Sequence, residues 1–245
     1  MAKRFNVTGL CVPEKHYMVD LTQRVKKIRE MVDDGFYFII NRARQYGKTT
    51  TLSALARELE RDYLVISLDF QMLGSASFRE ENTFSLSFLR ILLRELKRHG
   101  EAERAGTGQV LEQMQEVLEK NDRMFLLLAL FELLLGLCES SARPVVLMID
   151  EVDSASDNQV FLDFLAQLRN YYLERKAKGT AVFHSVVLAG VYDVKNLKRK
   201  VRPEEEHKMN SPWNIAADFK ISMSFSEEEI AGMLREYEAD HHTGM

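Results

Sequence analysis

Short apolar runs alternate with longer amphipathic segments along this chain. Each run is bounded by polar or glycine-containing residues, as expected for strands that are buried on both faces of a sheet. The predicted strands are residues 36–40, 63–69, 145–149, 183–190 and 219–223. Between most of them, apolar residues recur three or four positions apart, which is typical of helices with one buried face. The predicted helices are residues 20–34, 52–59, 84–99, 109–120, 124–138, 158–177 and 226–237. This alternation predicts an α/β fold, with a mainly parallel sheet between two layers of helices.

The most apolar segment is residues 124–138, in which Glu132 is the charged residue. It is shorter than the roughly 20 residues that a membrane-spanning helix needs. We therefore expect a buried helix and no association with a membrane. Together with residues 109–120, it forms a helical insertion before the strand at 145–149.

A loop with the sequence Asn41-Arg-Ala-Arg-Gln-Tyr-Gly-Lys-Thr-Thr50 joins the first predicted strand to the second predicted helix. A strand, a Gly-Lys-Thr loop and a helix are the context of a phosphate-binding loop, the Walker A motif. Backbone N–H groups of such a loop surround a phosphate, and the helix N-terminus adds partial positive charge. We expect Lys48 to reach the β- and γ-phosphates and the Thr49 hydroxyl to bind Mg²⁺. The predicted nucleotide-binding residues of the loop are Arg44, Gln45, Tyr46, Gly47, Lys48, Thr49 and Thr50.

The loop departs from the Walker A consensus at one position. The consensus has Gly five residues before Gly47, where this chain has Arg42. An arginine resists the positive φ angles that glycine accepts freely. Taken alone, Gly-Lys-Thr is also compatible with a surface turn that carries a solvated lysine.

The run Val145-Val-Leu-Met-Ile-Asp150-Glu151 ends in two carboxylates and predicts a Walker B strand. In parallel sheets, ligands bind beyond the carboxyl ends of the strands. We expect Asp150 to hold Mg²⁺ through its hydration shell and Glu151 to act as the general base for the attacking water. The alternative is an ordinary strand followed by an acidic helix cap, formed by Asp153 or Ser154. The two motifs in this order favour a nucleoside-triphosphate site.

These motifs resemble those of the AAA-like P-loop ATPases of bacteria and archaea, an ASCE-class family close to the STAND signalling ATPases. The residues that carry the resemblance are Tyr17-Met-Val-Asp20, the 41–49 loop, Ile149-Asp-Glu151 and Ser211-Pro-Trp-Asn-Ile215. In that family the form of the loop without the first glycine is common. Relatives often carry a C-terminal effector domain, sometimes one that resembles a PD-(D/E)xK nuclease.

The resemblance implies a P-loop NTPase three-layer sandwich with five strands in the order 5-1-4-3-2. It implies that the segment containing Tyr17 contacts adenine, although a tyrosine there is also compatible with a place in the core. It also implies a γ-phosphate sensor at the end of the fourth strand, where this chain has Tyr192 and Asp193 instead of Asn, Ser or Thr. Asp193 is equally compatible with a helix cap.

Five basic residues cluster after the fourth predicted strand, and three interpretations of them are open. They could supply an arginine finger to a neighbouring subunit, bind a nucleic-acid backbone, or form a solvated face balanced by Glu204-Glu-Glu206. Arg199 and Arg202 are the candidate fingers. The cluster comprises Lys195, Lys198, Arg199, Lys200 and Arg202.

Composition is consistent with this interpretation. The chain has 245 residues and a formal net charge of −4, which gives no overall attraction to nucleic acid. Cys11 and Cys138 lack the spacing of a metal site, and reduced thiols are typical of a cytosolic protein. No N-terminal targeting signal is apparent.

The sequence therefore predicts a cytoplasmic ATPase that hydrolyses ATP to ADP and phosphate with Mg²⁺ and couples this to a conformational change. The alternative is a slowly hydrolysing nucleotide-dependent switch that controls an effector or a nucleic-acid-acting domain. Expected partners are ATP, ADP and a second copy or an effector that supplies an arginine finger. We expect residues 1–225 to form the ATPase domain and residues 226–245 to begin a helical lid region that is cut short.

Overall fold

The computed structural model describes residues 3–7, 9–43, 45–98, 100, 106–155, 157–191 and 213–244. Its helices are α1 (Thr22–Asp33), α2 (Lys48–Leu59), α3 (Glu81–Arg98), α4 (Gly108–Lys120), α5 (Leu127–Ser140), α6 (Gln159–Lys178) and α8 (Glu227–His241). Its strands are β1 (Tyr37–Asn41), β2 (Leu64–Asp69), β3 (Val145–Asp150) and β4 (Ser185–Gly190). The predicted helices and the first four predicted strands agree with these elements to within a few residues.

The four strands form one parallel sheet in the order β1-β4-β3-β2. This is the predicted order without the fifth strand. Strand β4 therefore lies between β1, which leads into the predicted phosphate-binding loop, and β3, which ends at Asp150. The register places Asn41 beside Gly190 and Asp69 beside Asp150, so the carboxyl ends of all four strands meet at one edge.

The prediction of a fifth strand at residues 219–223 is wrong, because the structure describes these residues and they form no strand. The chain runs beside β1 here, but a single bridge joins Ala217 to Phe38. The segment is held mainly by side chains: the rings of Phe219 and Phe38 stack with centroids 6.0 Å apart, and Met223 is buried. Apolar residues at these positions thus reflect packing against the sheet, not pairing with it.

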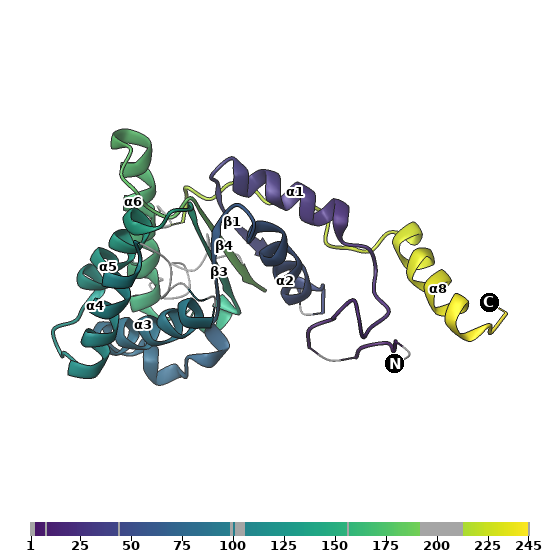
Figure 1. Cartoon of the computed structure of the whole chain (residues 1–245), viewed down its shortest axis with the longest axis horizontal. Coiled ribbons are helices and arrows are strands. Elements are labelled where there is room, and N and C mark those ends of the chain that lie inside the picture. The colour runs from purple at the N-terminus through teal and green to yellow at the C-terminus, as the bar shows by residue number, and fades with distance from the viewer. Residues whose placement is uncertain are drawn as a thin grey trace, which may run out of the picture.

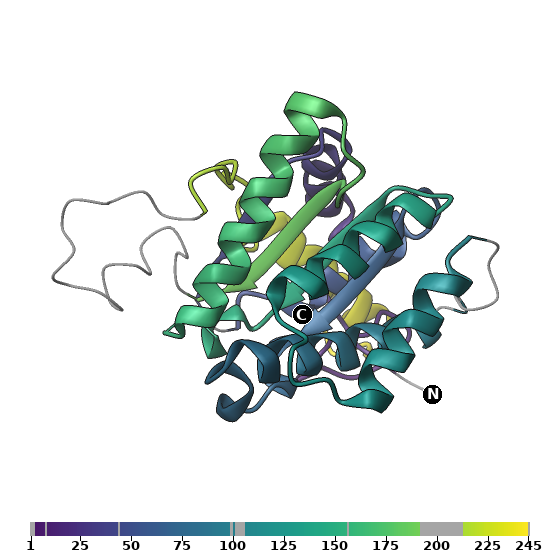
Figure 2. The same cartoon turned by 90° about the vertical axis from the view of Figure 1, so that its left-hand side faces the viewer.

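Helices cover both faces of the sheet (Figures 1 and 2). One face packs against α3, α5 and α6, with α4 outside α3 and α5, and the other packs against α1 and α2. Strand β3 shows how the sequence produces this arrangement. Val145, Leu147 and Ile149 belong to the first hydrophobic cluster, whereas Val146 and Met148 belong to the second. Alternate side chains of a strand point to opposite faces, so a continuous apolar run contributes to both layers.

The apolar segment 124–138 forms α5, which buries Leu130, Phe131 and Leu134 in the larger cluster. This agrees with the prediction of a buried helix. Across the parts of the chain that the structure describes, no helix has both the length and the apolar character to cross a bilayer.

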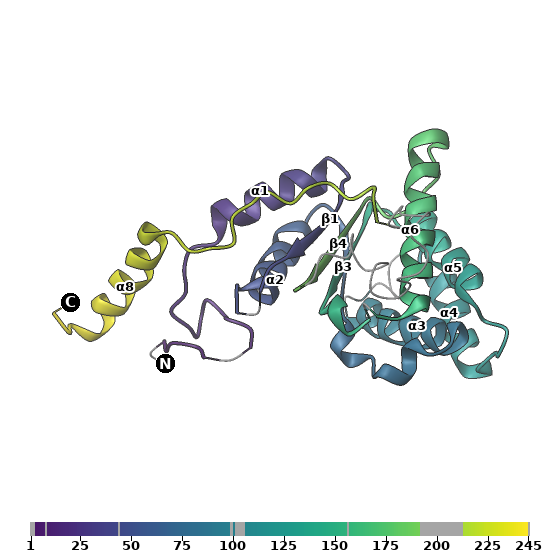
Figure 3. The same ribbon diagram turned by 180° about the vertical axis from the view of Figure 1, so that it is seen from behind.

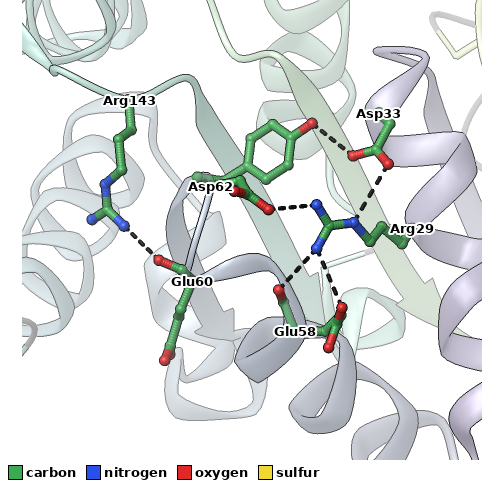
Figure 4. A network of polar contacts seen from close by, with 7 residues as sticks. Arg29, Asp33, Glu58, Glu60, Asp62 and Arg143 are labelled. Carbon is green, nitrogen blue, oxygen red and sulfur yellow. Dashed lines mark hydrogen bonds and ion pairs between the residues drawn. The ribbon is translucent and has the colours of Figure 1, made fainter.

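The side of α1 is fixed to the end of α2 by a group of charged residues (Figure 4). Arg29 contacts the carboxylates of Asp33, Glu58 and Asp62. The Tyr63 hydroxyl donates to Asp33 at 2.7 Å. These contacts hold α1 against the helix that begins at the phosphate-binding loop.

Helix α8 lies apart from the sheet, at the opposite end of the molecule from α3–α6 (Figures 1 and 3). It has no fully buried residue, and its contacts include the N-terminal segment. Phe5, Tyr17 and Tyr237 form a ring cluster with centroids 5.1–5.3 Å apart. Ser226 and Glu229 form a capping box that fixes the start of α8.

Candidate functional site

Two of the described residues in the loop between β1 and α2 have a left-handed backbone conformation. Gly47 has a φ of 68° and directly precedes α2, while Gln45 has a φ of 66°. Strained non-glycine residues of this kind concentrate at binding loops. Arg42 is not among the positive-φ residues, which explains why arginine is tolerated where the consensus has glycine. Its guanidinium group bonds the Asn41 and Ile221 carbonyl oxygens at 2.8 and 3.4 Å.

Lys48 is buried within this loop, with 6% of its surface exposed. Its Nζ donates to the carbonyl oxygens of Arg42 and Ala43, at 2.9 and 3.1 Å. The ammonium group is thus held at the mouth of the loop by neutral acceptors. A phosphate is a stronger, charged acceptor for the same group.

Thr49 and Asp150 bring the two sequence motifs together. The Thr49 hydroxyl donates to Asp150 Oδ2 at 2.7 Å, across 101 positions of sequence. Both groups supply the hard oxygen ligands that Mg²⁺ prefers, and Mg²⁺ usually takes only one or two of them from protein, completing its shell with water and phosphate. The pair fits the predicted metal site in its chemistry.

The carboxylates at the end of β3 have perturbed acidity. Burial raises the pKa of Asp150 above its ordinary value, and the hydrogen bond from Thr49 opposes that rise. Burial also raises the pKa of Glu151, followed by repulsion from Asp150, while the nearby Lys48 lowers it. Asp69, the register partner of Asp150, adds further repulsion to both groups. Two neighbouring carboxyl groups with raised pKa values at the carboxyl edge of a parallel sheet are typical of a functional site.

Glu151 has an unusual backbone conformation, with a φ of 54°. The strand therefore turns sharply at this residue, and residues 152–154 form a short 3-10 helix. Asp153 stabilises that turn, because its Oδ2 accepts a hydrogen bond from the Val191 amide at 2.6 Å. Gly190 leaves room for the turn: a Cβ there would lie 2.9 Å from Val152 Cγ2. The position of Glu151 thus depends on the end of β4.

A cavity of about 740 Å³ opens beside the loop. Gln45, Gly47 to Thr51 and Glu151 form its polar part, and Cys11 and Arg24 also line it. Its apolar lining is Phe5, Val7, Met18, Val19, Leu21, Phe225 and Met233. A polar pocket continuous with an apolar one matches a nucleotide, which has a polyanionic end and a flat aromatic end.

Among the described residues that were predicted to bind nucleotide, all but Tyr46 line this cavity, whereas the predicted metal ligand Asp150 lines a separate pocket that also contains Thr49. Tyr46 is 41% exposed and is not among the lining residues. Thr50 accepts a hydrogen bond from the Cys11 amide at 3.3 Å, which joins the N-terminal segment to α2.

Tyr17 lines the cavity and also packs in the ring cluster with Phe5 and Tyr237. Its position is therefore compatible both with contact to adenine and with a place in the core. Its hydroxyl donates to Asp240 at 2.7 Å and lies 3.1 Å from His241 Nε2. Burial, followed by the bond to Asp240, raises the pKa of Tyr17 to about 12. The side chain is therefore a neutral phenol that connects the cavity wall to α8.

The sequence did not indicate several of the lining residues, including Arg24 and Phe225. Arg24 lies on the apolar face of α1 between Leu21 and Ile28, and it is 6% exposed. The one feature of the sequence that could have identified Arg24 is its position as a charged residue on the apolar face of a predicted helix. Phe225 precedes α8 and is within 4.0 Å of where a Cβ on Gly47 would lie. No local pattern distinguishes it from other aromatic residues.

Several predicted residues lie outside the described part of the chain. These are Arg44 of the loop, the sensor candidates Tyr192 and Asp193, the basic residues from Lys195 to Arg202, and the first two residues of the 211–215 motif. The third residue of that motif, Trp213, is fully buried, and its ring stacks on Tyr37.

Comparison with known proteins gives one family match. The model of the AAA-like domain family matches residues 14–244, nearly the whole chain. No curated protein sequence matches. Among solved structures, the chain is similar to Cdc6p from Pyrobaculum aerophilum, with a TM-score of 0.49 and 13% identity. The match covers 90% of this chain and 49% of that one, so the chain spans about half the length of Cdc6p.

Proposed function

The chain belongs to the AAA-like domain family, and on this premise we propose that it binds ATP with Mg²⁺ and hydrolyses it to ADP and phosphate. The family makes it a P-loop ATPase-type nucleotide-binding module. Hydrolysis, the metal and the coupling to a conformational change are the parts that we propose. The observation that carries the proposal is the hydrogen bond between Thr49 and Asp150, which joins the two motifs beside the cavity that Thr49 and Glu151 line.

The phosphates occupy the polar part of the cavity in this proposal. Backbone amides at the start of α2 surround the β-phosphate, and the helix N-terminus adds positive charge. Lys48 exchanges the carbonyl oxygens of Arg42 and Ala43 for β- and γ-phosphate oxygens. Thr49 and Asp150 hold Mg²⁺, which when bound offsets negative charge on those phosphates.

Glu151 has the role of general base. Its carboxylate lies beside the same cavity and accepts a proton from the attacking water. The water oxygen then bonds to the γ-phosphorus, the bond to the bridging oxygen breaks, and ADP carries away the electron pair. Burial raises the pKa of Glu151, which makes it a stronger base than an exposed glutamate.

A slowly hydrolysing switch is the second candidate function. It is favoured by the position of α8, since Met233 of α8 and the preceding Phe225 both line the cavity. A nucleotide in the cavity would therefore contact α8, the helix that lies farthest from the sheet (Figure 3). The two candidates differ in turnover rate and share the binding step.

Binding is tested by calorimetry with ATP and Mg²⁺. The Lys48→Ala variant loses at least one charged hydrogen bond and should bind ATP more weakly by about 1.5–3 kcal/mol. Lys120→Ala is the matched control, because Lys120 is a lysine on α4 that pairs with Glu116 and does not line the cavity. Equal ATP affinity in the Lys48 variant and the wild type would overturn the proposal.

A further inference from the structure

Arg24 is buried beside the proposed nucleotide cavity with one of its nitrogen atoms unpartnered. The residue is 6% exposed, and Nη1 has no hydrogen-bond partner among the described residues. A buried, charged donor without an acceptor is unfavourable. Because Arg24 lines the cavity, a ligand in that cavity is the natural source of the missing acceptor.

The rest of the guanidinium group is fixed by the segment that leads into α8. Nη2 donates to the Ser224 carbonyl oxygen at 3.1 Å and lies 3.4 Å from the Glu229 carboxylate. The Phe225 ring centroid is 5.3 Å from Cζ, within the range of a cation–π contact. These contacts hold the guanidinium group in place before any ligand arrives and leave both N–H groups of Nη1 without an acceptor among the described residues.

Arg24 belongs to the apolar part of the cavity. Leu21, one turn earlier, and Phe225, beneath the guanidinium group, both contribute to the apolar wall. The phosphates are assigned to Lys48 and Thr49, and the apolar wall, which adjoins them at Phe225, is left for the base. On this assignment the base is the ligand group beside Arg24.

We propose that Arg24 selects purine nucleotides, with Nη1 donating a hydrogen bond to a ring nitrogen of the base while the base packs on the apolar wall. This inference rests on the proposed function and names a specificity residue for it. Purines present ring-nitrogen acceptors at N3 and N7, on a bicyclic ring that fills more of the apolar wall than a pyrimidine does. Because Nη2 is already engaged, the two-pronged contact of arginine with guanine O6 and N7 is not available. ATP and GTP should therefore share the contact.

The first test compares Arg24→Met with the wild type in equilibrium binding of ATP, GTP, CTP and inorganic tripolyphosphate. Methionine keeps an apolar stem and removes the donor. ATP and GTP should bind the variant roughly ten- to a hundredfold more weakly, as expected for a lost hydrogen bond to a charged group. CTP and tripolyphosphate, which lack the purine, should change little.

The second test identifies the acceptor on the base with 1-deaza-, 3-deaza- and 7-deaza-ATP, each of which lacks one ring nitrogen. One analogue should bind the wild type more weakly than ATP does, yet bind Arg24→Met as well as ATP does. Arg29→Met is the matched control. Arg29 lies on the same helix and contacts carboxylates (Figure 4), but it does not line this cavity, so ATP affinity should be retained in Arg29→Met.

Glu229→Gln separates a contact with the base from a structural role. This variant removes the charge beside Nη2 and leaves Nη1 free, so ATP affinity should be kept. A loss equal to that of Arg24→Met would show that the ion pair with α8 is what matters, and would overturn the inference.

Two further outcomes would also overturn it. An equal loss of tripolyphosphate affinity in Arg24→Met would make Arg24 a phosphate ligand, and unchanged ATP affinity would make its role purely structural. If ATP binding were abolished by Lys48→Ala and not weakened by Arg24→Met, only this inference would fail. If the wild type bound neither ATP nor tripolyphosphate, the proposed function itself would fail.

Discussion

The Thr49 hydroxyl lies 2.7 Å from the Asp150 carboxylate and donates a hydrogen bond to it. Thr49 is in the first turn of α2 and Asp150 is the last residue of β3. The contact exists because β4 separates β1 from β3, so that the loop after β1 reaches over β4 to the end of β3. Sheet order, and not closeness in sequence, thus creates the proposed metal site.

Replacing Glu151 with glutamine should separate ATP binding from hydrolysis. Glutamine keeps the shape and hydrogen-bonding capacity of the side chain and removes the proton acceptor. ATP affinity should therefore be retained, while the single-turnover rate falls by roughly 10²–10⁴-fold. Glu132→Gln, on the exposed side of α5, is the control. An unchanged rate in Glu151→Gln would show that another residue is the base, or that none is needed.

Asp150 should destabilise the chain at neutral pH when nucleotide is absent. Burial raises its pKa in the folded state, so folded protein binds that proton more tightly than unfolded protein does. Stability from this group is thus greatest below the unfolded pKa and declines as the pH rises towards the folded pKa. Asp150→Asn, which cannot ionise, should raise the melting temperature at pH 7 by roughly 2–4 °C, or about 1 kcal/mol.

The gain from Asp150→Asn should disappear below about pH 4, where the wild-type carboxyl is protonated in both states. Thermal unfolding without nucleotide, measured across this pH range, provides the test. Asp157→Asn, a substitution of the same kind at an exposed position, is the control. A lower melting temperature of Asp150→Asn at pH 7 would mean that the ionised carboxylate stabilises the fold. With Mg²⁺ and ATP present, we expect the same variant to need more Mg²⁺ for binding.

Gly190→Ala, a substitution at the end of the neighbouring strand β4, should displace Glu151. The added Cβ would lie 2.9 Å from Val152 Cγ2 and 3.0 Å from Asp153 Oδ1, so the turn after Glu151 has to move. Overpacking of this kind costs about 1–3 kcal/mol, and hydrolysis should fall more than ATP affinity does. Gly232→Ala is the control, because the nearest atom to its Cβ is 3.8 Å away and alanine favours a helix. Equal hydrolysis in Gly190→Ala and the wild type would contradict this coupling.

The sequence predicted the elements that carry strong local signals. The apolar runs identified β1 to β4, and the two motifs identified Lys48, Thr49 and Asp150. Their convergence followed from the strand order that the family resemblance implied. Local signals of this kind suffice because a phosphate-binding loop needs a fixed strand, loop and helix.

Features that depend on contacts between distant segments were not predictable in the same way. Phe219 lies in an apolar run that resembles a strand, yet it packs on the sheet through side chains. Arg24 and Phe225 are 201 positions apart, and their contact depends on how the chain before α8 returns past α1. A periodic pattern reports that a face is buried and does not report which segment covers it.

Turnover of ATP should increase with protein concentration. Among the described residues that line the cavity, Arg24 is the only arginine, and its guanidinium group is held in the apolar part. Charge that develops on the transferring phosphoryl group then lacks an arginine finger worth roughly 10³–10⁵ in rate. A second copy of the chain, or a partner, is expected to supply it, with Arg199 and Arg202 as the candidates from the sequence.

Specific activity measured over a wide range of protein concentration tests this expectation. A mixing experiment sharpens it, because a Lys48→Ala chain binds ATP poorly yet can still donate a finger. Excess Lys48→Ala chain should therefore raise the turnover of dilute wild-type protein. The same chain with Arg199→Ala and Arg202→Ala added should have no effect. Fast turnover that is independent of concentration, and unaffected by the Arg199→Ala/Arg202→Ala changes, would instead favour a self-sufficient monomer, because every group that stabilises the transferring phosphoryl would then belong to one chain.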